Sequence, residues 1–258
     1  MLTTPHNLPT SLIDSYQLNG FVHIPSVISP EEAARFRVAA LECQERVKSL
    51  TAGSIAEGVF NQLLNVWRVH PVMKELTLHP NVGAVAEKLA TVPLRLWHDH
   101  LLIKKPHNKM ATEFHQDHPY WPLDNAPNCL SAWIALQDVP VERGCMTFIN
   151  GSHRLTNLAS QDLMDRRDIF RKAPEFVWYP RTTVPLRAGD CTFHHGYCAH
   201  MATPNETDEF RVAHVVIFMD AAARYARRAD GNAHPVSDPL NLAAGAAMDD
   251  EIFPRVSC

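Results

Sequence analysis

From residue 94 to residue 105 the chain reads Leu-Arg-Leu-Trp-His-Asp-His-Leu-Leu-Ile-Lys-Lys. This stretch opens a part of the chain in which short runs of β-branched and aromatic residues alternate with Pro, Gly, Asn and Asp. Runs bounded in this way by turn-forming residues are typical of β-strands. The pattern predicts strands over residues 94–105, 113–117, 129–138, 145–149, 183–187, 190–195 and 210–219, after a short early strand over 21–25.

Helices are predicted upstream of this strand-rich part. Pro30 suits the first turn of a helix over residues 30–50, and Ser29 with Glu32 forms an S-x-x-E capping box. Pro71 opens a second helical region over residues 71–90. Helices followed by strands, without βαβ alternation, favour an antiparallel barrel or sandwich with helices packed outside. We therefore expect a mainly β fold with flanking helices, built on a jelly-roll core.

The length of 258 residues suits one large domain, and we find neither a repeat nor a dividing linker in the sequence. We expect a helical N-terminal part over residues 1–92, a jelly-roll core over 93–220 and a C-terminal extension over 221–258. Residues 155–181 are too long for an ordinary hairpin connection. They are predicted to form either a mobile cover over the site or a helix packed permanently on the barrel.

Composition and charge exclude several classes of function. Lys and Arg total 24 against 28 Asp and Glu, so the chain lacks the basic excess that nucleic acids and anionic membranes attract. We find neither a secretory signal nor an apolar run near the roughly 20 residues of a membrane span. The six cysteines form no C-x-x-C pair, so we expect reduced thiols and a cytoplasmic location. A small molecule is the expected partner, and the oligomeric state is left open.

The 15 histidines invite a search for metal ligands. His115 and Asp117 stand two positions apart, so on a strand both side chains would face one ion. His200 is the best candidate for a third ligand from a distant strand, and Arg211 on the following predicted strand could bind a carboxylate. One H-x-D sequence is expected by chance in a chain so rich in His and Asp. Spacing alone therefore leaves a surface pair open.

Two further histidine pairs are candidates for a metal site or a pocket. His98 and His100 would share one strand face, which makes a second metal site an alternative to cavity lining or core packing, and the last two are favoured. His194 and His195 adjoin the proposed ligand segment. We expect them to be structural or to support the ligands, with the lining of a pocket as the alternative for one of them.

The segments around these residues carry a family resemblance. They read FHQDHPYWP over residues 114–122, SAWIALQDV over 131–139, ERGCMTFINGSH over 142–153 and HMATPN over 200–205. With Asn19-Gly20-Phe21-Val22 near the start, they resemble the phytanoyl-CoA dioxygenase family over nearly the whole chain. The resemblance implies a double-stranded β-helix, a cupin-like jelly roll. It also implies an enzyme that uses Fe(II), 2-oxoglutarate and O2, typically to hydroxylate an unactivated carbon.

The resemblance further implies roles for individual residues. His115, Asp117 and His200 look like the iron ligands, and Arg211 looks like the partner of the distal carboxylate of 2-oxoglutarate. Family members often have a serine two positions after the last histidine, where this chain has Ala202, so it is open whether Thr203 replaces that hydroxyl. Three further positions match residues that approach the cosubstrate: Trp133, Gln116 and Leu101.

Hydroxylation of a small organic substrate is the expected activity, although desaturation, epoxidation and ring rearrangement use the same type of iron centre. A halogenase would replace the carboxylate ligand with a small residue, so Asp117 argues against that activity. Two alternatives are a catalytically silent jelly-roll binding protein and a metal-dependent cupin-like isomerase or lyase. A binding protein would not need Arg211 as a cosubstrate anchor. The sequence does not identify the substrate, and the family name does not imply acyl-CoA.

Overall fold

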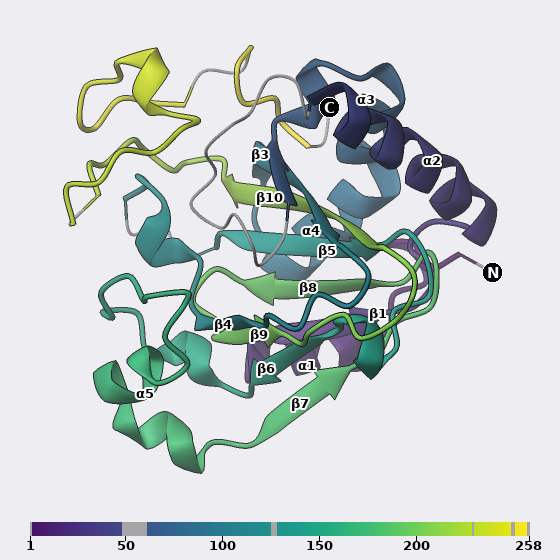
Figure 1. Cartoon of the computed structure of the whole chain (residues 1–258). Helices are drawn as coiled ribbons and strands as arrows, with labels where there is room; N and C mark the ends of the chain where they lie inside the picture. Colours follow the sequence, from purple (N-terminus) through teal and green to yellow (C-terminus); the bar gives the residue numbers. More distant parts are fainter. Residues whose placement is uncertain (1, 48–60, 125–127, 229, 249–250, 257–258) are drawn as a thin grey trace.

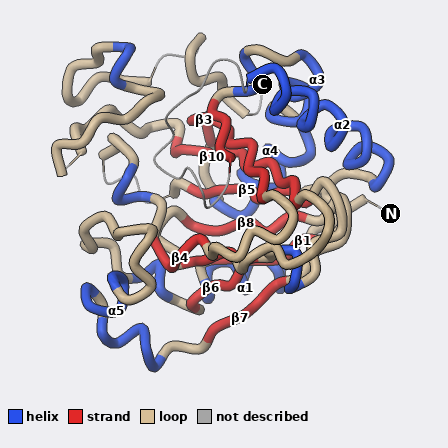
Figure 2. Tube along the Cα trace, viewed as in Figure 1, coloured by secondary structure: helices blue, strands red, loops and turns tan. Residues whose placement is uncertain are grey.

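The computed structural model describes residues 2–47, 61–124, 128–228, 230–248 and 251–256. Two antiparallel sheets lie face to face, and helices cover the outer side of the larger sheet (Figures 1 and 2). Side chains from the two inner faces fill the space between the sheets, as in other β-sandwiches. The predicted fold class, mainly β with flanking helices around a jelly roll, is confirmed.

The larger sheet has six strands in the order β1-β8-β5-β10-β3-β2, and the smaller sheet has four in the order β4-β9-β6-β7. Every strand predicted from the sequence has a counterpart. The short strands β2 and β9 were not predicted from the sequence. The strands are β1 (Phe21–Ile24), β2 (Asn61–Leu64), β3 (Leu94–Lys104), β4 (Thr112–His115), β5 (Leu130–Ala135), β6 (Met146–Ile149), β7 (Arg181–Val184), β8 (Cys191–His195), β9 (His200–Ala202) and β10 (Arg211–Asp220).

The helix predicted to start at Pro30 begins there. The backbone N–H of Glu32 donates to Ser29 Oγ at 3.1 Å and that of Ser29 to Glu32 Oε2 at 2.8 Å, so the capping box is confirmed. The helical region predicted over residues 71–90 consists of two helices. Pro80 starts a separate helix because its ring holds His79 extended, with φ −62° and ψ 118°. The helices are α1 (Thr10–Asn19), α2 (Pro30–Val47), α3 (Pro71–Thr77), α4 (Pro80–Ala90) and α5 (Asp168–Lys172); positions 48–50 of the predicted second helix lie outside the described residues.

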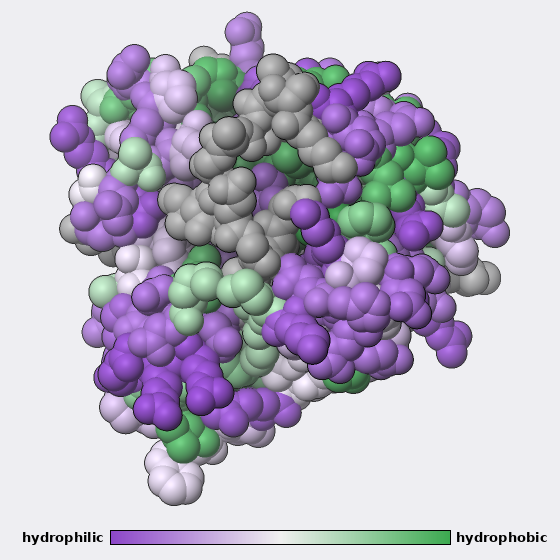
Figure 3. All heavy atoms as spheres, in the orientation of Figure 1, coloured by the Kyte–Doolittle hydropathy of each residue, from purple (hydrophilic) through white to green (hydrophobic). Residues whose placement is uncertain are grey.

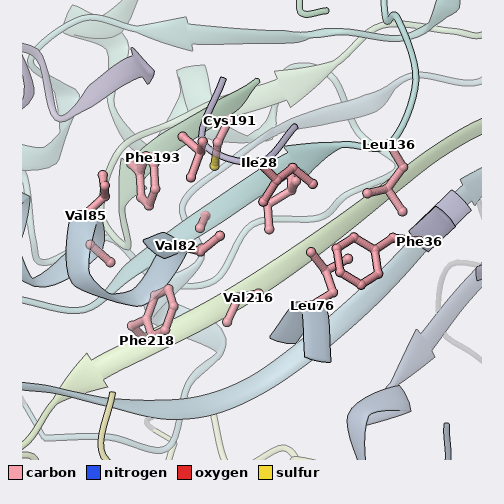
Figure 4. Close-up of a cluster of buried hydrophobic side chains, with 14 of the residues drawn as sticks. Ile28, Phe36, Leu76, Val82, Val85, Leu136, Cys191, Phe193, Val216 and Phe218 are labelled. Atoms are coloured by element: carbon pink, nitrogen blue, oxygen red, sulfur yellow. The ribbon is translucent and has the colours of Figure 1, made fainter. Parts of the chain in front are cut away.

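The outer face of the larger sheet forms an apolar core with the helices (Figure 4). Phe193 of β8 and Val216 of β10 lie against Val82 of α4, and all three side chains are fully buried. Phe36 of α2 and Leu76 of α3 complete the same cluster. Burial of this many large side chains is the main source of stability that this face can supply.

The inner face of the larger sheet packs against the smaller sheet in a second core. Phe21 of β1 stacks on Phe148 of β6 with ring centroids 4.3 Å apart, which joins the two sheets. Trp133 of β5 and Val215 of β10 belong to this cluster. This space also contains buried histidine, lysine and arginine side chains, among them Lys104 and Arg211. The site residues predicted from the sequence lie here.

Two segments flank the sandwich. Within residues 155–181, Ile169 and Phe176 are buried against Phe114 and Ile149, whereas Trp178 is 86% exposed. The C-terminal extension returns to β3, where Val256 donates its N–H to the Leu94 carbonyl at 3.1 Å. Hydrophilic residues cover most of the face shown in Figure 3. Among the described residues, we find no helix with the length and apolar character needed to cross a membrane.

Candidate active site

Two short strands of the smaller sheet bring two distant histidines together. β4 pairs with β9 so that His115 stands opposite His200, although they are 85 positions apart in the chain (200 minus 115). Their ring centroids are 4.3 Å apart. Long-range antiparallel pairing therefore makes one face from residues that no local pattern connects.

Hydrogen bonds fix which nitrogen each of these histidines can offer. His115 Nδ1 lies 2.8 Å from the Glu113 carbonyl and His200 Nδ1 lies 2.9 Å from the Cys198 carbonyl. A carbonyl oxygen only accepts, so each Nδ1 carries the hydrogen and each Nε2 keeps a free lone pair. Burial lowers the pKa of His200 well below its usual value and keeps the ring neutral. His200 therefore has the state that metal binding requires, and His115 presents the same ring nitrogen.

Asp117 completes the group, but not as a strand residue. β4 ends at His115, and Asp117 has φ −73° and ψ −43° at the start of a helical turn over His118–Tyr120. The prediction that strand alternation aligns His115 and Asp117 is wrong, because the turn rather than the pleat directs the carboxylate. Asp117 Oδ1 still lies 3.5 Å from His115 Nε2 and 3.7 Å from His200 Nε2.

The second carboxylate oxygen of Asp117 is held from the larger sheet. Ser131 Oγ donates to Oδ2 at 3.0 Å, and His194 Nε2 lies 3.3 Å from the same oxygen. Burial alone would raise the pKa of Asp117, but the neighbouring histidines, led by His200, hold it well below its usual value. The group is thus a carboxylate with Oδ2 occupied and Oδ1 directed at the two imidazoles.

Ligand atoms of His115, Asp117 and His200 all lie within 4.8 Å of one another. Among the described residues, this is the sole group of three or more His, Cys, Asp or Glu side chains gathered in this way. Two imidazoles and one carboxylate on one face suit a divalent transition metal and leave its remaining positions open. The donor set therefore fits non-haem iron, and its three members are the residues that the sequence analysis proposes as ligands.

A pair of buried basic side chains lies on the inner face at one end of the larger sheet. Arg211 of β10 stands opposite Lys104 of β3, and both are almost completely buried. Lys104 Nζ is within hydrogen-bond distance of the carbonyls of Met110, Ala202 and Thr203, which the three hydrogens of its ammonium form can satisfy. Burial, and then the charge of Arg211, lowers the pKa of Lys104 to about 6, so Arg211 is the main cation of the pair at neutral pH.

Arg211 has no such set of partners. Its Nε and Nη1 are buried without a hydrogen bond, and its guanidinium lies 5.4 Å from the centre of the Trp133 ring. Burial lowers its pKa to about 10, which still leaves it charged at neutral pH. A buried, unpaired guanidinium is costly, so this position fits an anionic group from outside the chain. A carboxylate is the planar partner that matches its geometry.

A family model described as phytanoyl-CoA dioxygenase (PhyH) matches residues 16–213, about three quarters of the chain. The chain belongs to the phytanoyl-CoA dioxygenase family. Curated relatives include a mouse phytanoyl-CoA dioxygenase domain-containing protein 1, 27% identical over 64% of this chain. A probable phytanoyl-CoA dioxygenase of Caenorhabditis elegans is 26% identical over 77% of this chain and 71% of its own. The match to the mouse protein spans 59% of that protein's length.

Two solved structures resemble the chain more closely. The non-heme α-ketoglutarate-dependent carbocyclase SnoK from nogalamycin biosynthesis is 36% identical, with a TM-score of 0.86 and full coverage of both chains. The epimerase SnoN, in complex with Fe³⁺, α-ketoglutarate and nogalamycin RO, is 35% identical, with a TM-score of 0.82. That match covers 96% of this chain and 98% of SnoN.

Three positions that the family resemblance assigned to the cosubstrate have different surroundings. Trp133 lies on the inner face beside the Arg211 guanidinium, where its approach to a cosubstrate stays a prediction. Gln116 instead donates from Nε2 to the carbonyls of Leu155 and Tyr197, so its amide joins three loops. Leu101 lies in the core beneath the helices, because alternation along β3 turns Leu102 inward and Leu101 outward. A cosubstrate contact by Leu101 does not fit this geometry.

The hydroxyl of Thr203 also points elsewhere. Its Oγ1 donates to the Val141 carbonyl at 2.8 Å, on the outside of the sandwich. The family serine missing at Ala202 is therefore not replaced by Thr203 in this structure. Sequence reasoning missed Ser131 and Lys104. Ser131 could have been found, because it lies two positions before Trp133 on β5 and therefore faces the same side of the sheet.

Proposed function

We propose that the chain is an Fe(II)- and 2-oxoglutarate-dependent oxygenase that oxidises a C–H bond of a small organic molecule. The observation that carries the proposal is that the inner face holds two different binding groups, one for a metal and one for an anion. One end has the donor set of His115, Asp117 and His200, and the other has the unpartnered guanidinium of Arg211. Trp133 lies between them. A dicarboxylate that chelates a metal at one end and meets an arginine at the other fits this spacing of functions.

Bound iron, 2-oxoglutarate and O2 would supply the oxidising chemistry, which converts 2-oxoglutarate to succinate and CO2. The chain holds and orients these groups. His115 and His200 offer Nε2, and Asp117 offers Oδ1 while Ser131 retains Oδ2. Arg211 binds the distal carboxylate in a site where Trp133 and the apolar residues of both sheets exclude water.

The reaction that follows C–H oxidation is the finer part of the proposal. Hydroxylation is the outcome expected from the family resemblance. Ring closure or epimerisation is the second candidate, because structures 36% and 35% identical to this chain are described as a carbocyclase and an epimerase. The mass of the product separates these outcomes: hydroxylation adds one oxygen atom, ring closure removes two hydrogen atoms, and epimerisation leaves the mass unchanged.

Succinate formation tests the proposal against a silent binding protein and against a metal-dependent isomerase or lyase. The purified protein, supplied with Fe(II), 2-oxoglutarate and O2, should release succinate. Asp117→Ala and His200→Ala should abolish this turnover and iron binding while the protein stays folded, because each removes one ligand. His107→Ala, a change at an exposed histidine, is the matched control. Turnover of His200→Ala at the parent rate would contradict the ligand assignment.

The proposal includes a small-molecule partner and a reducing compartment. The five described cysteines are buried and form no disulfide, as expected in a reducing compartment such as the predicted cytoplasmic location. Cysteine alkylation in intact cells, compared with alkylation after chemical reduction, would measure how much of each thiol is reduced.

A further inference from the structure

The inner face of the larger sheet carries a group of buried polar atoms that the metal and Arg211 do not use. They lie on β3 at a β-bulge, where Ile217 of β10 stands opposite His98 and the next residue, Phe218, stands opposite Leu96. Trp97 is the extra residue between them. A bulge breaks strict alternation, so consecutive side chains can turn to one side. Trp97 accordingly joins the inner core, while Leu96 stays in the outer core.

Sheet register places this bulge on the substrate side of the proposed metal. His98 stands opposite Ile217, Ile217 stands opposite Ser131, and Ser131 holds Asp117. His98 is thus two strands from Ser131, about 10 Å across the sheet. Lys104 is six residues further along β3, about 20 Å from His98. A cosubstrate held between Arg211 and the metal would therefore not reach His98.

Three polar atoms at the bulge are buried without partners. Both ring nitrogens of His98 and Nε1 of Trp97 have no hydrogen bond, although His98 is 1% exposed. The backbone of Asp99 is close to His98 but outside hydrogen-bond geometry. Each unmet buried donor or acceptor is costly, and such atoms call for a partner. Together they offer one indole donor and the donor and acceptor of one imidazole.

The rings around these atoms are aromatic and neutral, and the charges that act on them include those of Asp117 and Arg228. His100 stacks on His98 with ring centroids 4.6 Å apart, and His234 of the C-terminal extension stacks on Trp97 at 5.4 Å. Burial lowers the pKa of His100 and of His234 to about 4, so both rings are neutral at neutral pH. Arg228, the cation beside His234, is paired with Asp230. An anionic group would find no free cation in this set.

We propose that Trp97 and His98 form a binding site for an uncharged, hydroxyl-bearing aromatic ring of the substrate. A hydroxyl both accepts and donates, so it can satisfy the imidazole, and its flat ring would pack against the cluster formed by Trp97, His100 and His234. The assignment of this ring to the substrate rests on the proposed function, whereas the binding site itself does not.

Binding of 2-naphthol tests the site, since this probe is flat, uncharged and carries one hydroxyl. Two analogues isolate its features: 2-methoxynaphthalene cannot donate, and 2-naphthoate is an anion. The parent protein should bind 2-naphthol at least about tenfold more tightly than either analogue. His98→Phe should reduce the advantage over 2-methoxynaphthalene to below about threefold, and Trp97→Phe should reduce it in part. His107→Phe, the matched exposed change, should retain it.

Thermal unfolding establishes that each variant is folded, and His98→Gln, which keeps a donor and an acceptor, should retain part of the advantage even if His98→Phe does not fold. Each titration is made on the purified protein and repeated with Fe(II) and 2-oxoglutarate under nitrogen. An unchanged advantage in folded His98→Phe, or loss of it in His98→Gln and in His107→Phe alike, would overturn the site. So would equal binding of 2-naphthoate, or no binding of 2-naphthol at millimolar concentration. Failure to bind iron would contradict the proposed function alone.

Discussion

The two faces of the larger sheet bury polar groups in opposite ways. On the outer face, Asp99 accepts hydrogen bonds from the backbone N–H groups of Val66 and Trp67 and from Thr77 Oγ1, at 2.8 to 2.9 Å. On the inner face, Arg211 and His98 keep buried nitrogen atoms without partners. Burial is similar on both faces, so burial does not distinguish them. Hydrogen-bond satisfaction differs more: the outer face completes the Asp99 carboxyl within the chain and leaves His214 Nδ1 unpartnered, whereas Arg211 and His98 on the inner face each leave two nitrogens for groups that the chain does not supply.

Neighbouring residues on β8 give the largest test of this difference. Phe193 faces the helices and Thr192 faces inward, with its Oγ1 buried and unpartnered. Phe193→Ala should reduce the free energy of unfolding by about 3–5 kcal/mol, because it leaves a cavity in the outer core. Thr192→Val removes an unmet hydroxyl at nearly constant volume and should change that free energy by less than about 1 kcal/mol. Urea unfolding measures both, and equal losses would contradict the distinction between the faces.

Arg211 tests the inner face through binding. Arg211→Ala should weaken 2-oxoglutarate binding by tens to thousands of times, equivalent to about 2–5 kcal/mol, because it removes one partner of a buried charge pair. Iron affinity should change little. Anaerobic titration of the Fe(II) protein measures the dissociation constant, and Arg35→Ala, which alters an exposed ion pair with Glu75, is the control. The same dissociation constant in parent and Arg211→Ala would remove Arg211 from the site.

A smaller effect concerns His214 on the outer face. Burial, and then the nearby His100, lowers the pKa of His214 to about 3. Below pH 6.5 the unfolded chain binds a proton that the folded chain does not, so stability falls as the pH decreases from 6.5 towards 3. His214→Gln should reduce that pH dependence by one proton, about 1.4 kcal/mol per pH unit. Urea unfolding at pH 6.5, 5.5 and 4.5 measures the slope, and parallel curves for parent and variant would show the prediction to be wrong.

The smallest expected effect is at Thr203. Its hydroxyl already donates to the Val141 carbonyl, so Thr203→Val should change 2-oxoglutarate affinity by less than about twofold. The titration used for Arg211→Ala serves here. A tenfold loss would mean that Thr203 does replace the family serine and that the inner face extends further than the hydrogen bonds indicate.

For residues 155–181 the sequence leaves two alternatives, a mobile cover and a permanently packed helix, and the structure favours one of them for part of the segment. Phe176, one of the aromatics expected to close a pocket, is buried beside Ile169, while Trp178 is exposed. The packed part favours the fixed alternative for residues 168–176. Hydrogen exchange with and without substrate separates the two: a fixed segment should be protected in both states, and a mobile cover should gain protection when substrate binds.

The sequence by itself determined the strands, the capped start of α2 and the three residues that gather as a metal donor set. Strand alternation, capping residues and turn formers act over a few neighbouring positions, so a short stretch of sequence is enough to predict their effects. The break between α3 and α4 was also local, since Pro80 marks it, and the longer helical pattern hid it. The family resemblance supplied the link between distant motifs that no local pattern provides.

Only the tertiary structure decided which faces these residues occupy. Asp117 reaches His115 through a turn after the strand has ended. Leu101 faces outward because the register of β3 against β10 determines which face of the sheet it occupies. The bulge that admits Trp97 to the inner core arises from pairing with β10, more than 110 positions later in the chain. Register and bulges are set by contacts between strands far apart in sequence, so a single segment cannot specify them. The unpartnered nitrogens of Arg211 and His98 depend on the same long-range packing, because a missing partner is a property of everything around a residue.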